Sequence, residues 1–328
     1  MAKNLVEFRH LKTYFYTEAG VVQAVNDVSF SIREGETIGI VGESGCGKSI
    51  TAMSLMRLIP SPPGKIEAGE ILFEGKNLLS LREEEIRIMR SKEFAMIFQE
   101  PMSSLNPVLT IGDQIMEPLL EHLYMSKKEA RLKAIDLIKQ VGIPRAEEIM
   151  HSYPHELSGG MRQRVMIAIA LSCDPKLLIA DEPTTALDVT IQAQILELLK
   201  EIKEKRNMSL MLITHDLGVI AEMADYVVVM YAGKVIEEAP VRELFRNPRH
   251  PYTKGLLEAK PIIGKRKDRL YTIPGQVPNP IGLGDYCHFS ERCEFCMDIC
   301  REEQPVLKTY ESGNKVACWL EEKGGAGS

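Results

Sequence analysis

A glycine-rich segment near the N-terminus carries residue types and a spacing that suit phosphate chemistry. The residues Gly42, Glu43, Ser44, Gly45, Cys46, Gly47, Lys48 and Ser49 fit the pattern G-x-x-x-x-G-K-[ST] between an apolar run and a helical stretch. Glycines let backbone N–H groups surround a phosphate chain, and a helix start adds partial positive charge. Lys48 suits contact with the β- and γ-phosphates, and the Ser49 hydroxyl suits Mg²⁺. The pattern therefore predicts a nucleotide site, in which Cys46 is a small filler.

Two carboxylates directly follow another apolar run, residues 177–180. The carboxyl end of a parallel strand is where such a site meets its nucleotide. Asp181 is suited to hold Mg²⁺ through its waters, and Glu182 is suited to polarise an attacking water. Alone, two acids after a strand often form a solvated turn, but the phosphate loop favours the catalytic interpretation.

The elements that must position these residues alternate between strands and helices. The expected strands are residues 25–32, 37–41, 177–180 and 210–213, with a hairpin of 226–229 and 235–237 around Gly233; the expected helices are 48–58 and 191–205. This alternation predicts an α/β fold with a largely parallel sheet that is covered on its faces.

A helical region is expected between these strands. Ser126 and Glu129 have the spacing of a capping box, which predicts that a helix starts there. Leu132, Ile135, Ile138 and Val141 follow at helical spacing, and we expect this stripe to face the core.

Composition and charge exclude several classes of protein. The 328 residues carry 40 Lys and Arg against 46 Asp and Glu, a net charge of -6, so the chain lacks the basic footprint of a nucleic-acid binder. Its apolar runs are far shorter than the roughly 18 residues of a membrane-spanning helix, and the N-terminus lacks the pattern of a secretory signal. We therefore expect a cytoplasmic protein whose membrane role comes through partners.

The stretch Leu157-Ser158-Gly159-Gly160-Met161-Arg162-Gln163-Arg164 resembles the signature sequence of the ABC ATPase family. Further family motifs match in order: Gln99 resembles the Q-loop glutamine, Ala186-Leu187-Asp188 the D-loop, and His215 the switch histidine. Phe15 resembles the aromatic residue that stacks on adenine, with Tyr14 and Tyr16 as rivals. One departure is Ile50, because many family members have a hydroxyl residue there that touches the α-phosphate.

The resemblance implies a P-loop NTPase of ABC type, with a RecA-like core, an antiparallel β part and an α-helical subdomain at about 105–172. It implies a nucleotide-binding domain over residues 1–260 and a C-terminal extension over 261–328. Glu182, His215 and Gln99 take the catalytic roles, and Ser49, Gln99 and Asp181 hold Mg²⁺. Residues 42–50 bind ATP together with Phe15. Ser158 and Gly160 contact the γ-phosphate of ATP on an opposite subunit.

Longer matches narrow the resemblance to ATP-binding subunits of bacterial dipeptide and oligopeptide importers. They are residues 96–107, 181–190, 250–257 and the tail from Ile273 to Trp319. The resemblance implies two membrane permease subunits as partners, an extracytoplasmic peptide-binding protein acting indirectly, and a place at the cytoplasmic face of the membrane. It favours a second, different ATPase subunit over a homodimer.

Five of the seven cysteines cluster near the C-terminus: Cys287, Cys293, Cys296, Cys300 and Cys318. A reducing compartment disfavours disulfides, and the spacing fits paired zinc knuckles poorly. A compact group with one distant member is also an arrangement of iron-sulfur ligands. The resemblance singles out Cys287, Cys293, Cys300 and Cys318 as ligands of a [4Fe-4S] cluster and leaves Cys296 as an extra. Zinc and free thiols stay open as alternatives.

Other functions remain in competition with peptide import. The chain could power import of another solute, such as a metal chelate or a sugar. It could also be an ABC ATPase that acts on nucleic acid, but such proteins usually carry a coiled-coil insertion or two heads, and this chain has neither. An iron-sulfur redox protein with a regulatory ATPase is the third alternative.

Overall fold

A computed structural model describes residues 3–99, 104–185, 187–259, 271–310 and 313–324. They form two compact units, each assembled from separate stretches of the chain. The first unit comprises residues 1–3, 33–37 and 80–213, and the second comprises 4–32, 38–79 and 214–328. The predicted domain boundary at residues 260 and 261 lies outside the described residues and stays a prediction.

The first unit contains a short parallel sheet and a group of helices. Its strands are β6 (Phe94–Ile97), β7 (Leu177–Asp181) and β8 (Ser209–Ile213), and all their residues are buried. β7 pairs in parallel with both neighbours, so Leu177 lies opposite Phe94 on one side and Ser209 on the other. The helices are α2 (Glu83–Met89), α4 (Ile111–Leu123), α5 (Lys127–Gln140), α6 (Ala146–Ile149), α7 (Gly159–Ala170) and α8 (Val189–Arg206), with a 3₁₀ turn η2 (Pro154–Glu156). Buried parallel strands joined through helices confirm the expected α/β character.

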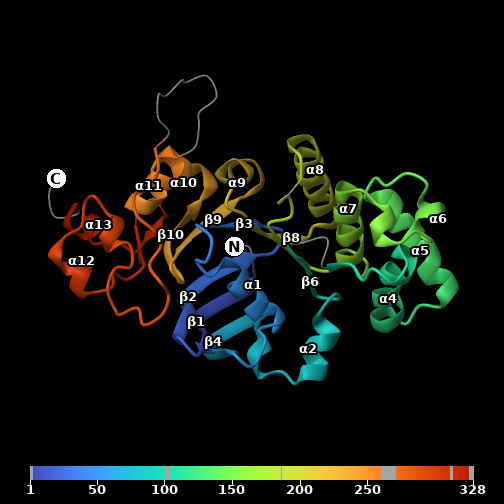
Figure 1. Cartoon of the computed structure of the whole chain (residues 1–328), viewed down its shortest axis with the longest axis horizontal. Coiled ribbons are helices and arrows are strands. Elements are labelled where there is room, and N and C mark those ends of the chain that lie inside the picture. Colours follow the sequence, from blue (N-terminus) through green and yellow to red (C-terminus); the bar gives the residue numbers. More distant parts are fainter. Residues whose placement is uncertain (1–2, 100–103, 186, 260–270, 311–312, 325–328) are drawn as a thin grey trace. The chain divides into compact units, whose positions relative to one another are not determined.

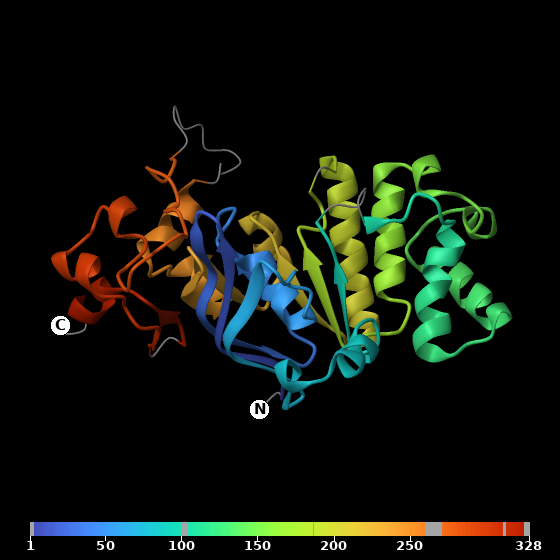
Figure 2. The same cartoon turned by 60° about the horizontal axis from the view of Figure 1, so that its bottom comes forward.

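The helices α4, α5 and α7 pack on one another within this unit, as Figure 2 shows for the green segments. The capping box at the start of α5 is confirmed, since the Ser126 hydroxyl accepts from the Glu129 N–H. The predicted core stripe is confirmed at Ile138 and Val141, which are fully buried, but Leu132 is wrong because it is 62% exposed. The buried face of α5 also includes Ala130, Ala134 and Leu137, where the small alanine side chains allow close helix packing.

The second unit contains an antiparallel sheet in the order β2-β1-β4-β5, whose first three strands Figure 1 shows side by side. The strands are β1 (Asn4–Thr17), β2 (Gly20–Arg33), β4 (Gly64–Phe73) and β5 (Lys76–Asn77), with a 3₁₀ turn η1 (Leu78–Ser80) that follows β5. Period-two burial on β1 and β2 puts Phe8 against Phe30, with ring centroids 4.5 Å apart. This sheet is the expected antiparallel part.

The second unit also contains β3 (Thr37–Val41), which pairs in parallel with β9 (Tyr226–Tyr231). β9 forms a hairpin with β10 (Lys234–Pro240) around Gly233, as predicted, and β12 (Lys315–Val316) and β11 (Lys308–Thr309) extend that edge. The helices are α1 (Lys48–Met56), α9 (Leu217–Met223), α10 (Val241–Arg246), α11 (Pro251–Glu258), α12 (Asp298–Glu302) and α13 (Trp319–Gly324), with a 3₁₀ turn η3 (Ser290–Arg292).

Candidate functional site

The phosphate loop connects the buried strand β3 to the start of α1 in the second unit. Gly47 precedes α1 with φ of 97°, and a Cβ there would lie 2.3 Å from the Ala24 carbonyl oxygen. Only glycine fits such a position. Among the described residues, no side chain accepts a hydrogen bond from the first N–H groups of α1. These N–H groups are therefore available to an anion. The loop therefore has the backbone geometry of an anion site.

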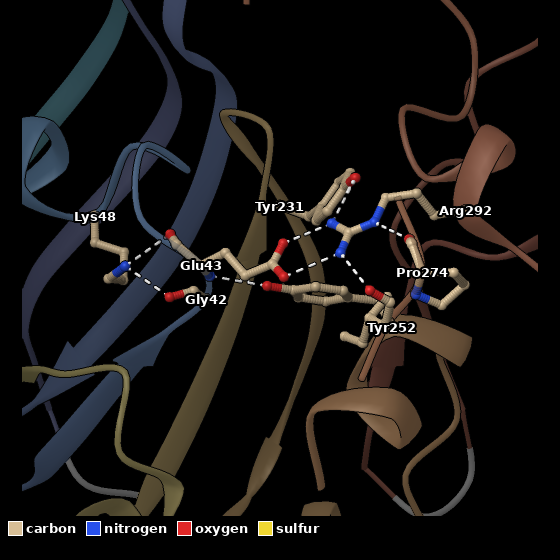
Figure 3. Close-up of polar contacts among 8 residues, drawn as sticks. Gly42, Glu43, Lys48, Tyr231, Tyr252, Pro274 and Arg292 are labelled. Atoms are coloured by element: carbon tan, nitrogen blue, oxygen red, sulfur yellow. Dashed lines mark hydrogen bonds and ion pairs between the residues drawn. The ribbon is translucent and has the colours of Figure 1, made fainter. Parts of the chain in front are cut away.

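The side chain of Lys48 folds back onto this loop and is only 6% exposed. Its Nζ donates to the carbonyl oxygens of Gly42, at 2.7 Å, and Glu43, at 3.0 Å (Figure 3). An ammonium has three donors and no acceptor, so phosphate oxygens are natural replacements for these carbonyls. Burial raises the pKa of the neighbouring Cys46 thiol and keeps it protonated, which agrees with its predicted role as a filler.

The aromatic residues near the end of β1 differ in what they contact. The Tyr14 hydroxyl donates to Asn26 and the Tyr16 hydroxyl to Glu67. Phe15 occupies the same face of β1 as Thr13, whose hydroxyl lies 2.9 Å from that of Ser54 on α1. This face adjoins the helix that follows the phosphate loop, which favours Phe15 over both tyrosines for adenine stacking.

The switch histidine is expected at His215, which is exposed and belongs to the second unit. The N–H of the preceding residue, Thr214, donates to the carbonyl of Ile40 at 3.3 Å. Because Ile40 lies on β3, two residues before Gly42, the chain places His215 beside the strand that leads into the phosphate loop.

The two carboxylates lie at the end of β7 in the first unit. Asp181 is 4% exposed. Glu182 has a left-handed φ of 45°, and its N–H donates to the carbonyl of Ile213. Its Oε2 accepts from Gln99 Nε2, at 3.0 Å, and from the Thr185 hydroxyl, at 2.9 Å. A backbone held in this uncommon region is often found at functional sites.

The signature residues start α7, also in the first unit. Ser158 is the N-cap, and its hydroxyl accepts from the Met161 N–H at 3.3 Å. A Cβ at Gly160 would lie 2.9 Å from the Ile191 side chain, so glycine allows α8 to approach closely. Asp188 of the expected D-loop caps α8 by accepting from the Ile191 N–H, while Ala186 lies outside the described residues. The helix predicted to begin at the signature sequence is confirmed, and its role as an anion receptor stays a prediction.

Thr185 was missed by the sequence reasoning, although it lies within the importer-like stretch of residues 181–190. The available signal was its place three residues after Glu182, where a hydroxyl reaches back to the carboxylate. In all, the structure brings Gln99, Asp181 and Glu182 together in one unit, and the phosphate loop and His215 in the other.

Comparisons with known proteins agree with the predicted resemblance to ABC importer ATPases. Residues 25–185 match the ABC transporter family, and residues 236–300 match the family described as "Oligopeptide/dipeptide transporter, C-terminal region". The chain is 57% identical to the oligopeptide transport ATP-binding protein AppD of Bacillus subtilis (strain 168), over 98% of each chain. It is 49% identical to the dipeptide transport ATP-binding protein DppD of the same organism, over 98% of this chain and 96% of DppD.

The chain belongs to the oligopeptide and dipeptide ABC transporter family.

A solved structure supports the fold of this ABC ATPase. The chain is similar to the ATP-binding cassette MJ0796 in a dimeric post-hydrolysis state bound to ADP and Pi, with a TM-score of 0.65 and 28% identity. The alignment covers 72% of this chain and 99% of that one. The predictions of an ABC-type P-loop fold and of an ATPase are confirmed. No helix among the described residues is long and apolar enough to cross a membrane.

The cysteine-rich tail of this ABC ATPase brings four thiols to one pocket. The pocket is lined by Cys287, Cys293, Cys300 and Cys318 together with His250, Pro251, Phe289, Ser290, Phe295, Trp319 and Leu320. Cys296 is not among these residues; its Sγ contacts the Met297 carbonyl. Burial raises the pKa of Cys287 to about 12 and of Cys318 to about 11, so both carry protons.

The predicted metal site of the tail is not confirmed. Within the described part of the chain, His, Cys, Asp and Glu side chains form no group of three or more that could hold a metal ion. All seven cysteines are free thiols in the structure.

Proposed function

We propose that this chain hydrolyses ATP to power import of dipeptides or oligopeptides. The observation that carries the proposal is the match of residues 236–300 to the oligopeptide/dipeptide transporter C-terminal region, in a chain whose residues 25–185 match the ABC transporter family. Its partners are two permease subunits, a second and different ATPase subunit, and indirectly an extracytoplasmic peptide-binding protein. It acts at the cytoplasmic face of the membrane, without contact to nucleic acid.

The phosphate loop binds ATP by exchanging one set of Lys48 acceptors for another. Lys48 leaves the carbonyls of Gly42 and Glu43 for the phosphates, while the N–H groups of the loop and the start of α1 surround them. Residues 42–50 line the phosphates, and Phe15 stacks on adenine. Ile50 has no hydroxyl for the α-phosphate, so backbone donors replace that contact.

Three oxygen-bearing side chains suit the Mg²⁺ that accompanies ATP. Ser49 supplies a hydroxyl, Asp181 a carboxylate, and Gln99 an amide oxygen, all of which are ligand types that Mg²⁺ prefers. The Gln99 amide nitrogen is engaged with Glu182, so its oxygen faces another direction and is the atom for the metal. When bound, the ion would neutralise charge on the β- and γ-phosphates.

Glu182 orients and polarises the attacking water. The hydrogen bonds from Gln99 and Thr185 favour the charged carboxylate, which is the form that accepts a proton. His215 contacts the γ-phosphate and helps hold this water. The start of α7, with Ser158 and Gly160, receives the γ-phosphate bound to the opposite subunit, so ATP joins two subunits and hydrolysis lets them part.

Reconstitution tests this function. The chain, its permease subunits and its partner ATPase are placed in liposomes with the peptide-binding protein, and ATP hydrolysis is measured with and without peptide. We expect peptides to stimulate hydrolysis several-fold and to accumulate on the opposite side. Stimulation by a sugar or a metal chelate, but not by peptides, would contradict peptide import.

We further propose that Cys287, Cys293, Cys300 and Cys318 hold a [4Fe-4S] cluster. The support is that these four thiols line one pocket, whose other residues include the apolar Phe289, Phe295, Trp319 and Leu320. In the described residues the thiols are not grouped as metal ligands, so binding of the cluster would have to draw them together. Four thiolates are the usual ligand set of such a cluster. Each thiol must lose its proton, so binding would be linked to folding of this segment.

Anaerobic purification tests the cluster by metal analysis. We expect iron and sulfide in equal amounts and broad visible absorption. Cys300→Ser should lose most of the iron, whereas the matched variant Cys296→Ser should retain it. A colourless protein with stoichiometric zinc would replace the cluster by the zinc alternative, and a metal-free protein would leave free thiols.

A further inference from the structure

Glu43, the second residue of the phosphate loop, is held from three sides (Figure 3). Its carbonyl accepts from Lys48 Nζ at 3.0 Å. Its N–H donates to the Tyr252 hydroxyl at 2.9 Å. Its carboxylate accepts two hydrogen bonds from Arg292, at 2.6 Å and 3.1 Å. One loop residue therefore connects the phosphate-binding lysine to side chains about 210 and 250 positions later in the chain.

Arg292 is fixed on every side of its guanidinium. It ends η3, one residue before Cys293, and its side chain is only 5% exposed. Besides Glu43, its Nε donates to the Pro274 carbonyl at 2.8 Å, and Nη1 donates to the Tyr231 hydroxyl at 3.3 Å. A planar fork with five donors can satisfy all these acceptors, whereas a lysine ammonium cannot reach them together.

Tyr252 is equally immobilised. It lies in the first turn of α11, is fully buried, and its N–H donates to His250 Nδ1. Its ring packs edge-on against Tyr231, with centroids 4.7 Å apart, and against Phe289, at 5.5 Å. The hydroxyl that meets the Glu43 N–H therefore has one available position. This gives a structural role to the importer-like segment of residues 250–257.

The ion pair between Arg292 and Glu43 also neutralises a negative charge at the phosphate loop. The Glu43 side chain is 31% exposed, and a carboxylate beside a triphosphate site would repel the ligand. Arg292 cancels this charge through a bidentate pair, the strongest form of such contacts.

We propose that Arg292 and Tyr252 are positioning residues of the phosphate loop. They hold Glu43 so that its carbonyl sets the resting place of Lys48, and Arg292 removes the repulsion between the Glu43 carboxylate and ATP. The segment that carries the cysteines thereby supports the nucleotide site. This inference rests on the proposed binding of ATP at the loop.

The test compares Arg292→Gln with the double variant Glu43→Gln/Arg292→Gln, using a fluorescent ATP analogue for Kd and steady-state hydrolysis for kcat and KM. We expect Arg292→Gln to raise Kd about ten-fold, because the Glu43 charge is uncovered, while kcat changes less than about two-fold. The double variant should bring Kd back to within about three-fold of the unmodified protein, since no charge is left to uncover. A purely structural role for Arg292 predicts no such rescue.

Arg249→Gln is the matched control. Arg249 is likewise a partly buried arginine that pairs with a glutamate of the tail, Glu321 at 2.7 Å, whereas the guanidinium that bonds Glu43 is that of Arg292. We expect its Kd to stay unchanged. Equal losses in Arg249→Gln and Arg292→Gln would overturn the proposal, as would unchanged affinity in Arg292→Gln or failure of the double variant to recover.

Tyr252→Phe decides the matter if Arg292→Gln fails to fold, as judged by thermal unfolding. It removes a single oxygen and should raise Kd about three-fold through loss of one hydrogen bond to Glu43. Unchanged affinity would overturn the proposal. An unmodified protein that binds no ATP would instead refute the proposed function, so the two failures are distinguishable.

Discussion

The phosphate loop and the carboxylate turn each follow a short, fully buried strand, yet they are held in different ways. Beyond β7, Glu182 is fixed by Thr185, three residues away, and by Gln99 of the same unit. Beyond β3, Glu43 is fixed by Tyr252 and Arg292, from the C-terminal part of the chain. Residues 236–300, which match the importer-specific family, contain both of these anchors. The carboxylate turn is thus held by residues of the general cassette, and the phosphate loop is held by residues of the importer-specific part.

The largest effect should come from the carboxylate turn. Glu182→Gln removes the base but keeps the shape and one hydrogen-bond acceptor, so kcat should fall by about 10²–10⁴-fold. Kd for ATP should change less than about two-fold, because the binding loop is anchored elsewhere. Nucleotide titration measures Kd and hydrolysis assays on the same preparation measure kcat. Undiminished hydrolysis would remove Glu182 from the role of base.

Lys48→Ala should instead act mainly on ATP binding. Loss of charge-assisted bonds to the phosphates should weaken ATP binding by about 100-fold, with no saturable hydrolysis at ordinary ATP concentrations. Titration with a fluorescent ATP analogue measures this loss, and circular dichroism checks that the fold is retained. Tight binding by Lys48→Ala would show that the loop does not bind nucleotide as described.

Thr185→Val should give a smaller change that is confined to catalysis. The substitution removes the hydroxyl that donates to Glu182 Oε2, while Gln99 still donates to the same oxygen. We expect kcat to fall about ten-fold or less, with Kd unchanged. Thr185→Ser keeps the hydroxyl and should retain most of the rate. If Thr185→Val lowered kcat and also weakened ATP binding, the phosphate loop and the carboxylate turn would not be separable.

Local signals account for most of what the sequence predicted correctly. The strand over residues 37–41, the capping box at Ser126 and the hairpin around Gly233 depend on neighbours in the chain, and the structure has all three. The core stripe of α5 was wrong at Leu132, because helical periodicity gives the spacing of apolar residues but does not show where small residues form part of the buried face. Ala130 and Ala134 contribute little apolar signal, yet they form the buried side.

Long-range contacts explain what the sequence could not predict. Arg292 was visible only as a residue beside Cys293, because nothing local indicates a partner 249 positions earlier. Tyr252 was visible only as part of an importer-like segment. Motif matching identified residues that touch the ligand, and only packing could identify residues that hold them. The assigned roles of the site residues stay predictions that the variants above test.

The smallest expected effect concerns the support of α11, which carries Tyr252. Glu237 on β10 is fully buried, and its two carboxylate oxygens accept from the N–H groups of Arg249, at 2.8 Å, and His250, at 2.9 Å. Burial raises the pKa of Glu237 above its usual value, although these hydrogen bonds oppose the shift. The anchor of the binding loop therefore rests on a titratable group remote from the nucleotide.

The raised pKa gives this support a pH dependence with a defined sign. Between the ordinary carboxyl pKa and the raised value, the folded protein holds a proton that the unfolded chain has lost, so the contribution of Glu237 to stability declines as pH rises through that window. Glu237→Gln cannot titrate there, and its loss of one acceptor has the same cost at every pH. The free energy of unfolding of the variant, relative to that of the unmodified protein, should therefore increase from pH 5 toward neutral. The increase should be at most about 1.4 kcal/mol per pH unit. Urea unfolding at several pH values measures this difference, and a constant difference would show that Glu237 keeps the same charge in both states.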